Sequence, residues 1–244
     1  MQLNNENYTL DGIGNIYIYQ PKKGYRFSVD SILLFIYSPK KNIKKVLDIG
    51  AGTGICSFLF SRELPDSQIT AVELQQEFSK LIKKGIEYNN FKNIKVYNKN
   101  INRIYKKFLS ETFDLIISNP PYRKYGHGRL SKYKNKNFAI YDKYLKLNQL
   151  FNIVEFLLNK NGVFSFINIP SNYKKILDIL ENFEINIKKE IHFKNQNNKK
   201  FIIFHLVKNK IKDKKIETIK KDIWESKVNA LYKGDYEFKG HYFS

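Results

Sequence analysis

This chain has little cysteine and no long apolar runs. Its 244 residues contain a single cysteine, Cys56, so a disulfide framework and a cysteine-cluster metal site are both excluded. No apolar stretch is long enough to span a bilayer, and the first residues lack the charged, apolar and small-residue order of a signal peptide. We therefore expect a cytoplasmic protein that has no membrane contact and binds no metal.

Acidic residues are scarce as well. The chain carries 23 acidic and 43 basic residues, which give a formal net charge of +20. Such an excess favours a polyanionic partner, because basic side chains that contact phosphates release bound counterions. Lysine, asparagine, isoleucine and tyrosine are abundant along the whole chain, however, so part of the charge is background. Clusters of basic residues are therefore a better guide than the total.

A glycine-rich turn follows the apolar run from Val46 to Ile49. The turn begins at Gly50, has the spacing G-x-G-x-G and leads into a helical pattern. A strand, a tight glycine turn and a helix form the first unit of a nucleotide-binding α/β sheet. The spacing differs from the G-x-G-x-x-G of dinucleotide sites, and the acidic Asp48 would repel a pyrophosphate. A cationic ligand such as S-adenosylmethionine is favoured instead. The candidate contacts are Asp48, Gly50, Gly52, Thr53 and Gly54.

Glu73 stands at the end of the next predicted strand, Gln68 to Val72. A carboxylate about twenty residues after such a turn accepts hydrogen bonds from both hydroxyls of a ribose. Taken alone, Glu73 is equally an ordinary solvated charge at a strand end. Together with the glycine turn, it predicts a ribose contact.

The tetrapeptide Asn119-Pro120-Pro121-Tyr122 directly follows a buried-strand pattern. Its two prolines lack backbone donors and end the strand in a stiff loop. The Asn119 amide oxygen and the Pro120 carbonyl suit the two hydrogens of a planar exocyclic amine, and the ring of Tyr122 suits stacking on the attached base. The alternative is a proline-stiffened turn without a ligand. Because the tetrapeptide comes after the glycine turn, we interpret Asn119, Pro120 and Tyr122 as catalytic candidates, with Asn119 also bordering the cofactor.

Basic and aromatic residues follow this tetrapeptide at once. Tyrosine, histidine and glycine are interleaved with the basic side chains, a mixture that suits a bent single strand whose bases stack and whose phosphates need cations. We favour RNA contact over a solvated mobile loop. The candidate RNA contacts are Arg123, Lys124, Arg129, Lys132, Lys134 and Lys136.

The rest of the chain alternates between helix and strand patterns, as a doubly wound sheet requires. We expect helices over 77–88, 144–158 and 174–180, strands over 93–97 and 162–167, and a closing β-hairpin of 185–193 and 201–207 around a polar link. No repeat or proline-rich linker divides the chain.

The order of these motifs resembles the class I S-adenosylmethionine-dependent amino-methyltransferases. The matching stretches are D-I-G-x-G-x-G from Asp48, V-E-L around Glu73 and S-N-P-P-Y around Asn119. The stretch from Tyr25 to Leu34 is similar to the opening segment of the tRNA adenine N6-methyltransferases, whose target is adenine-37 of a valine tRNA. Segments at 224–226 and 230–232 resemble that family's closing segment, so the resemblance covers nearly the whole chain.

The resemblance implies a Rossmann-like class I methyltransferase fold, with a seven-stranded, mostly parallel sheet, helices on both faces and a C-terminal β-hairpin. Along the chain we expect an N-terminal extension (1–40) packed on the core, a methyltransferase domain (41–208) and a basic, aromatic tail (209–244) of the same domain. The resemblance also implies an adenine contact after the third strand, where the family usually has an acidic residue and this chain has the run Tyr97 to Ile101, with Asn100 and Ile101 as the candidate contacts. The amide oxygen of Asn100 accepts a hydrogen bond more weakly than a carboxylate. The segment Phe138 to Asp142 departs from the family's arginine and glutamate.

The sequence thus predicts an S-adenosylmethionine-dependent enzyme, acting as a monomer, that methylates N6 of an adenine in tRNA. Three alternatives stay open. The same tetrapeptide serves enzymes that methylate a glutamine amide in release factors, although the basic segment argues against a protein substrate. A DNA adenine methyltransferase usually needs a separate target-recognition domain. A non-catalytic RNA-binding protein would not need the complete set of Asp48, Gly50, Gly52, Gly54, Glu73 and Asn119.

Overall fold

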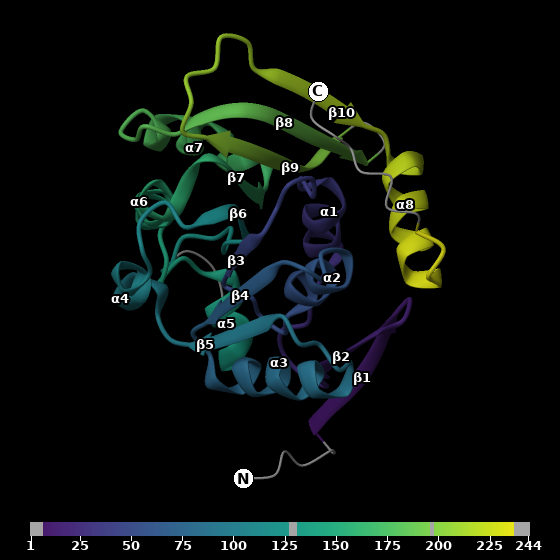
Figure 1. Ribbon diagram of the computed structural model, residues 1–244. Coiled ribbons are helices and arrows are strands. Elements are labelled where there is room, and N and C mark those ends of the chain that lie inside the picture. The colour runs from purple at the N-terminus through teal and green to yellow at the C-terminus, as the bar shows by residue number, and fades with distance from the viewer. Residues whose placement is uncertain (1–6, 127–130, 196–197, 237–244) are drawn as a thin grey trace.

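A mostly parallel β-sheet runs through the centre of the molecule (Figure 1). The computed structural model describes residues 7–126, 131–195 and 198–236. The strand order is β10-β8-β9-β7-β6-β3-β4-β5, and β9 is antiparallel to both of its neighbours. The strands are β3 (Lys45–Ile49), β4 (Gln68–Glu73), β5 (Ile94–Asn98), β6 (Phe113–Ser118), β7 (Leu158–Asn168), β8 (Asn186–Asn195), β9 (Asn198–Val207) and β10 (Lys215–Ile219).

The central strands are apolar because both faces of the sheet are covered. Leu115, Ile116 and Ile117 of β6 have no exposed surface, although they point alternately to the two faces. β3 pairs in parallel with β4 on one side and β6 on the other. The carboxyl ends of these three strands therefore meet at one edge of the sheet, and the loops that follow them lie together.

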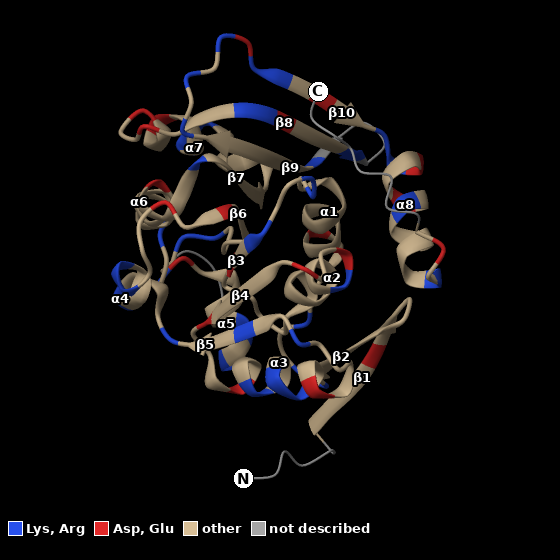
Figure 2. Ribbon diagram, viewed as in Figure 1, with Lys and Arg blue, Asp and Glu red and all other residues tan. Residues whose placement is uncertain are grey.

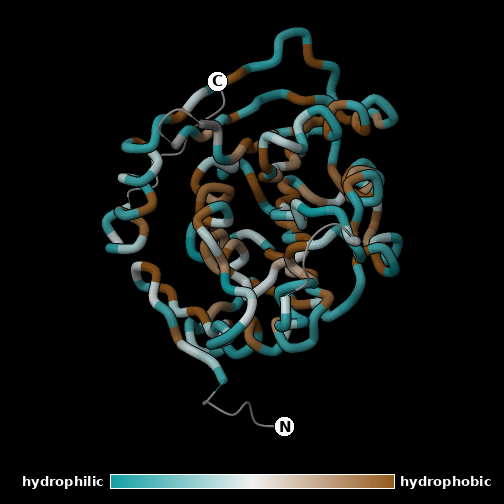
Figure 3. The backbone as a smooth tube through the Cα atoms, turned by 180° about the vertical axis from the view of Figure 1, so that it is seen from behind, coloured by the Kyte–Doolittle hydropathy of each residue, from teal (hydrophilic) through white to brown (hydrophobic). Residues whose placement is uncertain are grey.

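Helices form a layer on each face of the sheet, and Figure 1 shows the two layers on either side of it. One apolar core packs α1, α2 and α8 against the sheet, and a second packs α4, α6 and α7 against the other face. Figure 3 shows apolar segments gathered in the interior and polar segments on the outer turns. The helices are α1 (Val29–Tyr37), α2 (Ile55–Glu63), α3 (Gln76–Tyr88), α4 (Ile101–Ile104), α5 (Lys134–Ile140), α6 (Leu147–Leu157), α7 (Tyr173–Leu180) and α8 (Lys221–Lys233), with the 3-10 turns η2 (Tyr105–Lys107) and η3 (Pro170–Asn172).

The first forty residues contribute a hairpin and a buried helix. β1 (Tyr8–Ile13) and β2 (Ile16–Pro21) pair antiparallel as a separate two-stranded sheet. α1 is apolar on all sides, and its residues from Asp30 to Tyr37 are buried. A helix that is hydrophobic all round belongs inside a protein. The amino end of α1 thereby lies at a fixed position in the core.

Three local expectations were wrong in detail. The sheet has eight strands in the described part of the chain rather than seven, because β10 adds to the edge in parallel with β8. The polar link of the hairpin is shorter than expected, since β8 and β9 pair as far as Asn195 and Asn198. Residues Lys134–Ile140 form the helix α5, which begins within the basic segment that the sequence predicts as an RNA contact and continues to Ile140.

Candidate active site

A pocket lies at the carboxyl ends of β3, β4 and β6, and its volume is about 740 Å³ when the adjoining open solvent is included. It collects residues from the glycine turn, from the ends of β4 and β6, from the chain after β5 and from the segment 138–145. Its walls are formed by Tyr25, Ile49, Gly50, Gly52, Val72, Glu73, Leu74, Gln75, Phe78, Lys99, Asn100, Ile101, Ser118, Asn119, Pro120, Pro121, Phe138, Ala139, Tyr141, Tyr144 and Leu145.

The glycines of the turn have different roles. Gly50 lines the pocket at φ +75°, and a Cβ added there would meet no atom within 4 Å. A side chain at Gly50 would therefore project into open space, as expected where a ligand approaches the backbone. Gly54 has φ +92°, but a Cβ there would lie 3.1 Å from Ile82 and 3.2 Å from Phe58. Gly54 thus permits close packing of α2 on α3, and the structure places it outside the pocket lining.

Glu73 is 5% exposed and lines the pocket at the end of β4. Its Oε2 accepts a hydrogen bond from the Gly52 amide at 2.8 Å, and its Oε1 accepts one from the Gln75 amide at 2.7 Å. Each carboxylate oxygen retains acceptor capacity beyond these bonds. Burial raises the pKa of Glu73 to about 7, and the two backbone amides oppose that rise. The carboxyl group is thus pre-oriented and poorly solvated, so it gains from a ligand with hydroxyl donors.

Asp48 and Thr53 lie behind the pocket wall. Asp48 is buried, its Oδ2 accepts a hydrogen bond from the Ser57 hydroxyl at 2.6 Å, and burial raises its pKa to about 6. Thr53 is 1% exposed. Neither residue lines the pocket, so the structure gives Asp48 the role of joining β3 to α2 beneath the glycine turn. Its charge still lies close enough to Glu73 to raise the pKa of that carboxyl group.

Asn100 and Ile101 lie together on the far side of the pocket, after β5. Ile101 is buried and lines the wall. The Asn100 side chain accepts a hydrogen bond from the Asn102 amide at 3.0 Å, which caps α4. An Asn side chain at this position stabilises a helix start, and its oxygen has one further lone pair for a ligand.

The amide of Asn119 is held from two directions. Its Nδ2 donates to the Ser31 hydroxyl at 3.0 Å, and its Oδ1 accepts from the Tyr122 hydroxyl at 2.6 Å. The Tyr122 hydroxyl also lies 2.8 Å from Asp30 Oδ2. Asp30 and Ser31 belong to the first turn of α1, so the amino end of this buried helix fixes the orientation of Asn119. Sequence reasoning missed these two residues, although they stand in the stretch Tyr25 to Leu34 that carries the family resemblance.

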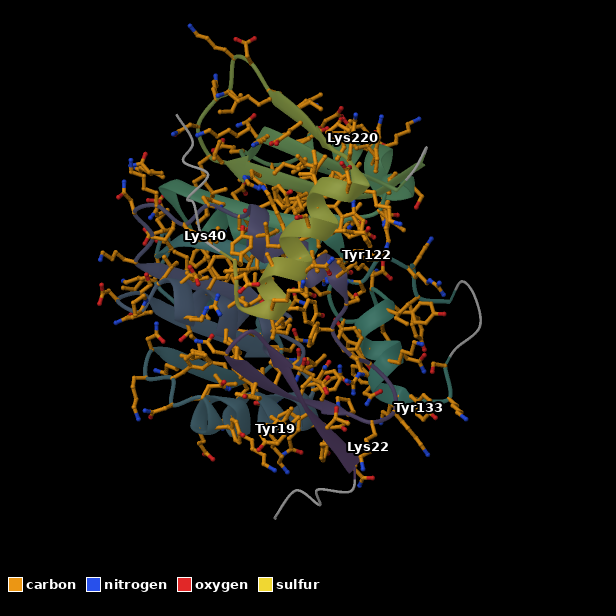
Figure 4. The ribbon with its side chains drawn as sticks, turned by 90° about the vertical axis from the view of Figure 1, so that its right-hand side faces the viewer. Tyr19, Lys22, Lys40, Tyr122, Tyr133 and Lys220 are labelled. Atoms are coloured by element: carbon orange, nitrogen blue, oxygen red, sulfur yellow. The ribbon has the colours of Figure 1, made fainter. Side chains whose placement is uncertain are left out.

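Tyr122 has its hydroxyl turned inward. Burial raises the pKa of this hydroxyl well above 10, and the neighbouring Asp30 carboxylate adds to the rise. Tyr122 is absent from the pocket lining, whereas Asn119, Pro120 and Pro121 are present. Figure 4 labels both Tyr122 and Tyr133, and Tyr133 lies below Tyr122 in this view. The geometry gives Tyr122 a hydrogen-bonding role toward Asn119, and stacking on a base remains a prediction.

An aromatic wall that the sequence did not predict faces the strand ends. Phe138 of α5 stacks on Tyr144 with ring centroids 4.5 Å apart and planes 4° apart. α5 is connected to the N-terminal segment, because Asn135 Oδ1 accepts from the Tyr25 amide at 3.3 Å. The Tyr25 ring in turn lies 3.4 Å from the position of a Cβ on Gly52. The sequence feature that pointed to this aromatic wall was the departure of the segment Phe138 to Asp142 from the family pattern.

The predicted RNA contacts lie around the pocket rather than in it. Lys132, Lys134 and Lys136 are exposed on and just before α5, and Arg123 and Lys124 are exposed after Tyr122. Arg129 lies outside the described residues. Figure 2 shows basic residues on α3, α4 and the β8–β10 region as well, so charge alone does not single out one surface. Within the described residues, no group of three or more His, Cys, Asp or Glu side chains is arranged to hold a metal, and no helix is long and apolar enough to cross a membrane.

Comparison with known proteins identifies the family. The model of the methyltransferase small domain matches residues 27–135. A tRNA1(Val) (adenine(37)-N6)-methyltransferase of Haemophilus influenzae (strain PittEE) is 32% identical over 163 residues, which are 66% of this chain and 68% of that protein. This chain belongs to the tRNA1(Val) (adenine(37)-N6)-methyltransferase family. A family member of the same name from Pseudoalteromonas translucida is 29% identical over 142 residues, 58% of this chain and 59% of that protein.

The fold comparison agrees. A crystal structure of a predicted O-methyltransferase from Agrobacterium tumefaciens superposes with a TM-score of 0.58 at 15% identity, over 79% of this chain and 85% of that one. At such low identity the likeness bears on the fold alone. The comparisons confirm the family that the motifs predict and the class I methyltransferase fold, with its mostly parallel sheet and its C-terminal hairpin.

Proposed function

We propose that this protein transfers a methyl group from S-adenosylmethionine to N6 of an adenine in tRNA, and that the adenine is at position 37 of a valine tRNA. One observation carries the proposal. One pocket is lined by a buried carboxylate beside a glycine turn and, after the end of the neighbouring strand, by Asn119 and Pro120. The names of the curated family members support the substrate.

The residues of the pocket fit the cofactor. Gly50 borders open space, Glu73 has unused acceptor capacity, and the carboxyl groups of Asp48 and Glu73 have pKa values raised to about 6 and about 7. A cationic ligand with ribose hydroxyls would stabilise the ionised form of both groups. Glu73 would hold the ribose, Gly50 and Gly52 the methionine part, and Asn100 and Ile101 the adenine. When bound, S-adenosylmethionine supplies a methyl group activated by a sulfonium.

The Asn119 oxygen and the Pro120 carbonyl would hold the target amine. The lone pair of an aromatic amine is delocalised into its ring, so the amine attacks weakly unless both of its hydrogens are held. Ser31 binds the Asn119 nitrogen, which leaves the Asn119 oxygen as the acceptor toward the amine. That oxygen already accepts from Tyr122 and has a second lone pair available. These residues would act by orientation and electrostatics.

The RNA substrate would approach over α5. Lys132, Lys134 and Lys136 are exposed there, and Phe138 of the same helix reaches the pocket. An adenine in an anticodon loop leaves its stack more cheaply than one in a duplex. We propose that Arg123, Lys124 and the three α5 lysines contact phosphates of the loop, and that the protein acts as a cytoplasmic monomer with tRNA as its partner.

Labelled methyl transfer to two transcripts tests the proposal. We expect transfer from S-adenosylmethionine to an unmodified valine tRNA transcript, and none to the same transcript with guanine at position 37. Equal labelling of both transcripts would contradict the position. Labelling of a release-factor glutamine with no labelling of RNA would contradict the substrate class.

A further inference from the structure

A second basic surface begins directly after Tyr122 and leads away from the pocket. It is a groove between the chain after β6, the connection from α5 to α6 and the helix α7. Its basic residues are Lys124, Lys143, Lys146 and Lys175, and Tyr125 lies among them. We call these five residues the α7 groove. Three of its four lysines, Lys143, Lys146 and Lys175, come from parts of the sequence outside the basic segment that follows the tetrapeptide.

Backbone hydrogen bonds join the groove to the Asn-Pro-Pro-Tyr loop. The Arg123 amide donates to Ile140 O at 3.1 Å, and the Asp142 amide donates to Arg123 O at 2.9 Å. In addition, Asn172 Nδ2 donates to Tyr122 O at 3.0 Å from the turn that precedes α7. The end of the Asn-Pro-Pro-Tyr loop is therefore fixed between α5 and α7. A chain that leaves the pocket on this side meets the groove next.

The charge of the groove is positive and little compensated. The neighbouring Asp142 carboxylate, which also lines this surface, accepts from the Tyr125 amide at 2.8 Å and lies 3.9 Å from Lys175. In the described part of the chain, no ion pair is formed by Lys124, Lys143 or Lys146. Lys143 lies 4.6 Å from the centre of the Tyr125 ring instead. Lysines without carboxylate partners, next to an aromatic ring, match the requirements of a nucleic-acid backbone better than those of an acidic protein surface.

Tyr125 links the groove to the pocket. Its side chain is 45% exposed, and the edge of its ring meets Tyr141, which lines the pocket, with centroids 6.3 Å apart. The cation–π contact with Lys143 restrains the ring. An exposed, restrained tyrosine at the mouth of a base-binding pocket suits stacking of a nucleotide next to the one that enters it.

We propose that the α7 groove binds the phosphates of the tRNA strand on one side of the target adenosine, while the lysines of α5 bind the strand on the other side. The inference rests on the proposed function for the identity of the nucleic acid. It assigns Lys143, Lys146 and Lys175 to phosphates, and Tyr125 to the flanking base.

The test compares two triple variants that lose the same charge. The first is Lys143→Ala, Lys146→Ala and Lys175→Ala. The control is Lys92→Ala, Lys210→Ala and Lys212→Ala, which removes three exposed lysines that follow α3 or β9, near the amino ends of the parallel strands. Fluorescence anisotropy with a valine tRNA transcript at several salt concentrations gives the affinities, and methyl transfer is measured on the same samples.

The groove variant should bind tRNA at least tenfold more weakly at about 0.1 M salt, and its plot of log affinity against log salt should be shallower by about two, because each phosphate contact on a single strand contributes about 0.7. Its apparent KM for tRNA should rise. Equal affinity and equal salt slope in the two triple variants would overturn the groove proposal. If the wild type still transferred methyl to tRNA in that case, the proposed function would stand. Groove-dependent tRNA binding without methyl transfer by the wild type would support the groove and contradict the proposed function. Absence of tRNA binding by the wild type would contradict both.

Discussion

The two halves of the pocket are built in different ways. The half proposed to bind the cofactor comes from consecutive strand ends. Gly50 and Gly52 follow β3, and Glu73 is the last residue of β4, so all three lie within one continuous stretch of chain. The half proposed to bind the substrate comes from distant segments, because Tyr25, Asn119 and Phe138 meet only through α1, β6 and α5. The first half is encoded locally by turn chemistry, and the second depends on tertiary packing. Variants in the two halves should therefore separate cofactor binding from methyl transfer.

The largest effect is expected in the substrate half. Asn119→Ala removes the amide acceptor for the amine, so single-turnover methyl transfer should fall by about 10²-fold or more, near 3 kcal/mol, by analogy with loss of one preorganised donor. Cofactor affinity, measured by calorimetry, should change little.

Tyr122→Phe is the matched control for Asn119. Both substitutions break the hydrogen bond between Tyr122 and Asn119, but only Asn119→Ala removes the amine acceptor. Tyr122→Phe should therefore lose clearly less of the methyl-transfer rate. Equal losses would mean that the orientation of Asn119, rather than its oxygen, supports the reaction.

Glu73→Ala should weaken the binding of S-adenosylmethionine. Loss of charge-assisted hydrogen bonds to the ribose should raise the Kd for S-adenosylmethionine by about ten- to a hundredfold, or about 1.5–3 kcal/mol. Calorimetry measures this change, and Glu87→Ala at the far end of α3 serves as a control for loss of one carboxylate. An unchanged Kd in Glu73→Ala would remove Glu73 from the cofactor site.

The protonation of Glu73 should make the stability of the ligand-free protein depend on pH. Its pKa is raised from 4.5 to about 7 by burial, so the folded protein binds more protons than the unfolded chain between these values. The resulting stabilisation is complete below pH 4.5 and is lost as the pH rises through 7. Between pH 5.5 and 7.5, the free energy of unfolding of the wild type should therefore fall by about 2 kcal/mol more than that of Glu73→Gln. Denaturant titrations measure the difference, and parallel pH profiles would contradict the raised pKa.

Phe138→Ala tests whether Phe138 belongs to the substrate half or to the cofactor half of the pocket. The substitution removes the ring that stacks on Tyr144 and lines the pocket. Loss of aromatic contact with the base should raise the apparent KM for tRNA by about tenfold, within the range of about 1–3 kcal/mol for one stacked base. The Kd for S-adenosylmethionine should stay the same. A weaker Kd with an unchanged KM would place Phe138 in the cofactor half instead.

This contrast also explains which features the sequence predicts. The glycine turn, Glu73 and the Asn-Pro-Pro-Tyr loop each combine a strand pattern with residues of restricted geometry, so their placement at the strand ends follows from short segments. The helix α5 was not predicted, because it has only seven residues, most of them polar, and because contacts with distant residues such as Tyr25 stabilise it. The strand β10 was missed for a similar reason. Its Ile216 is 61% exposed and its pattern does not alternate, so its pairing with β8 decides its conformation.

Identification of the methylated atom tests the central claim most directly. The claim is that the Asn119 oxygen and the Pro120 carbonyl hold the exocyclic amine of an adenine for methyl transfer. A valine tRNA transcript is incubated with the protein and S-adenosylmethionine carrying a labelled methyl group, then digested to nucleosides and analysed by mass spectrometry against standards. The account predicts N6-methyladenosine as the labelled product, with strongly reduced formation by Asn119→Ala. A label on a ring nitrogen, on a ribose or on another base would contradict it.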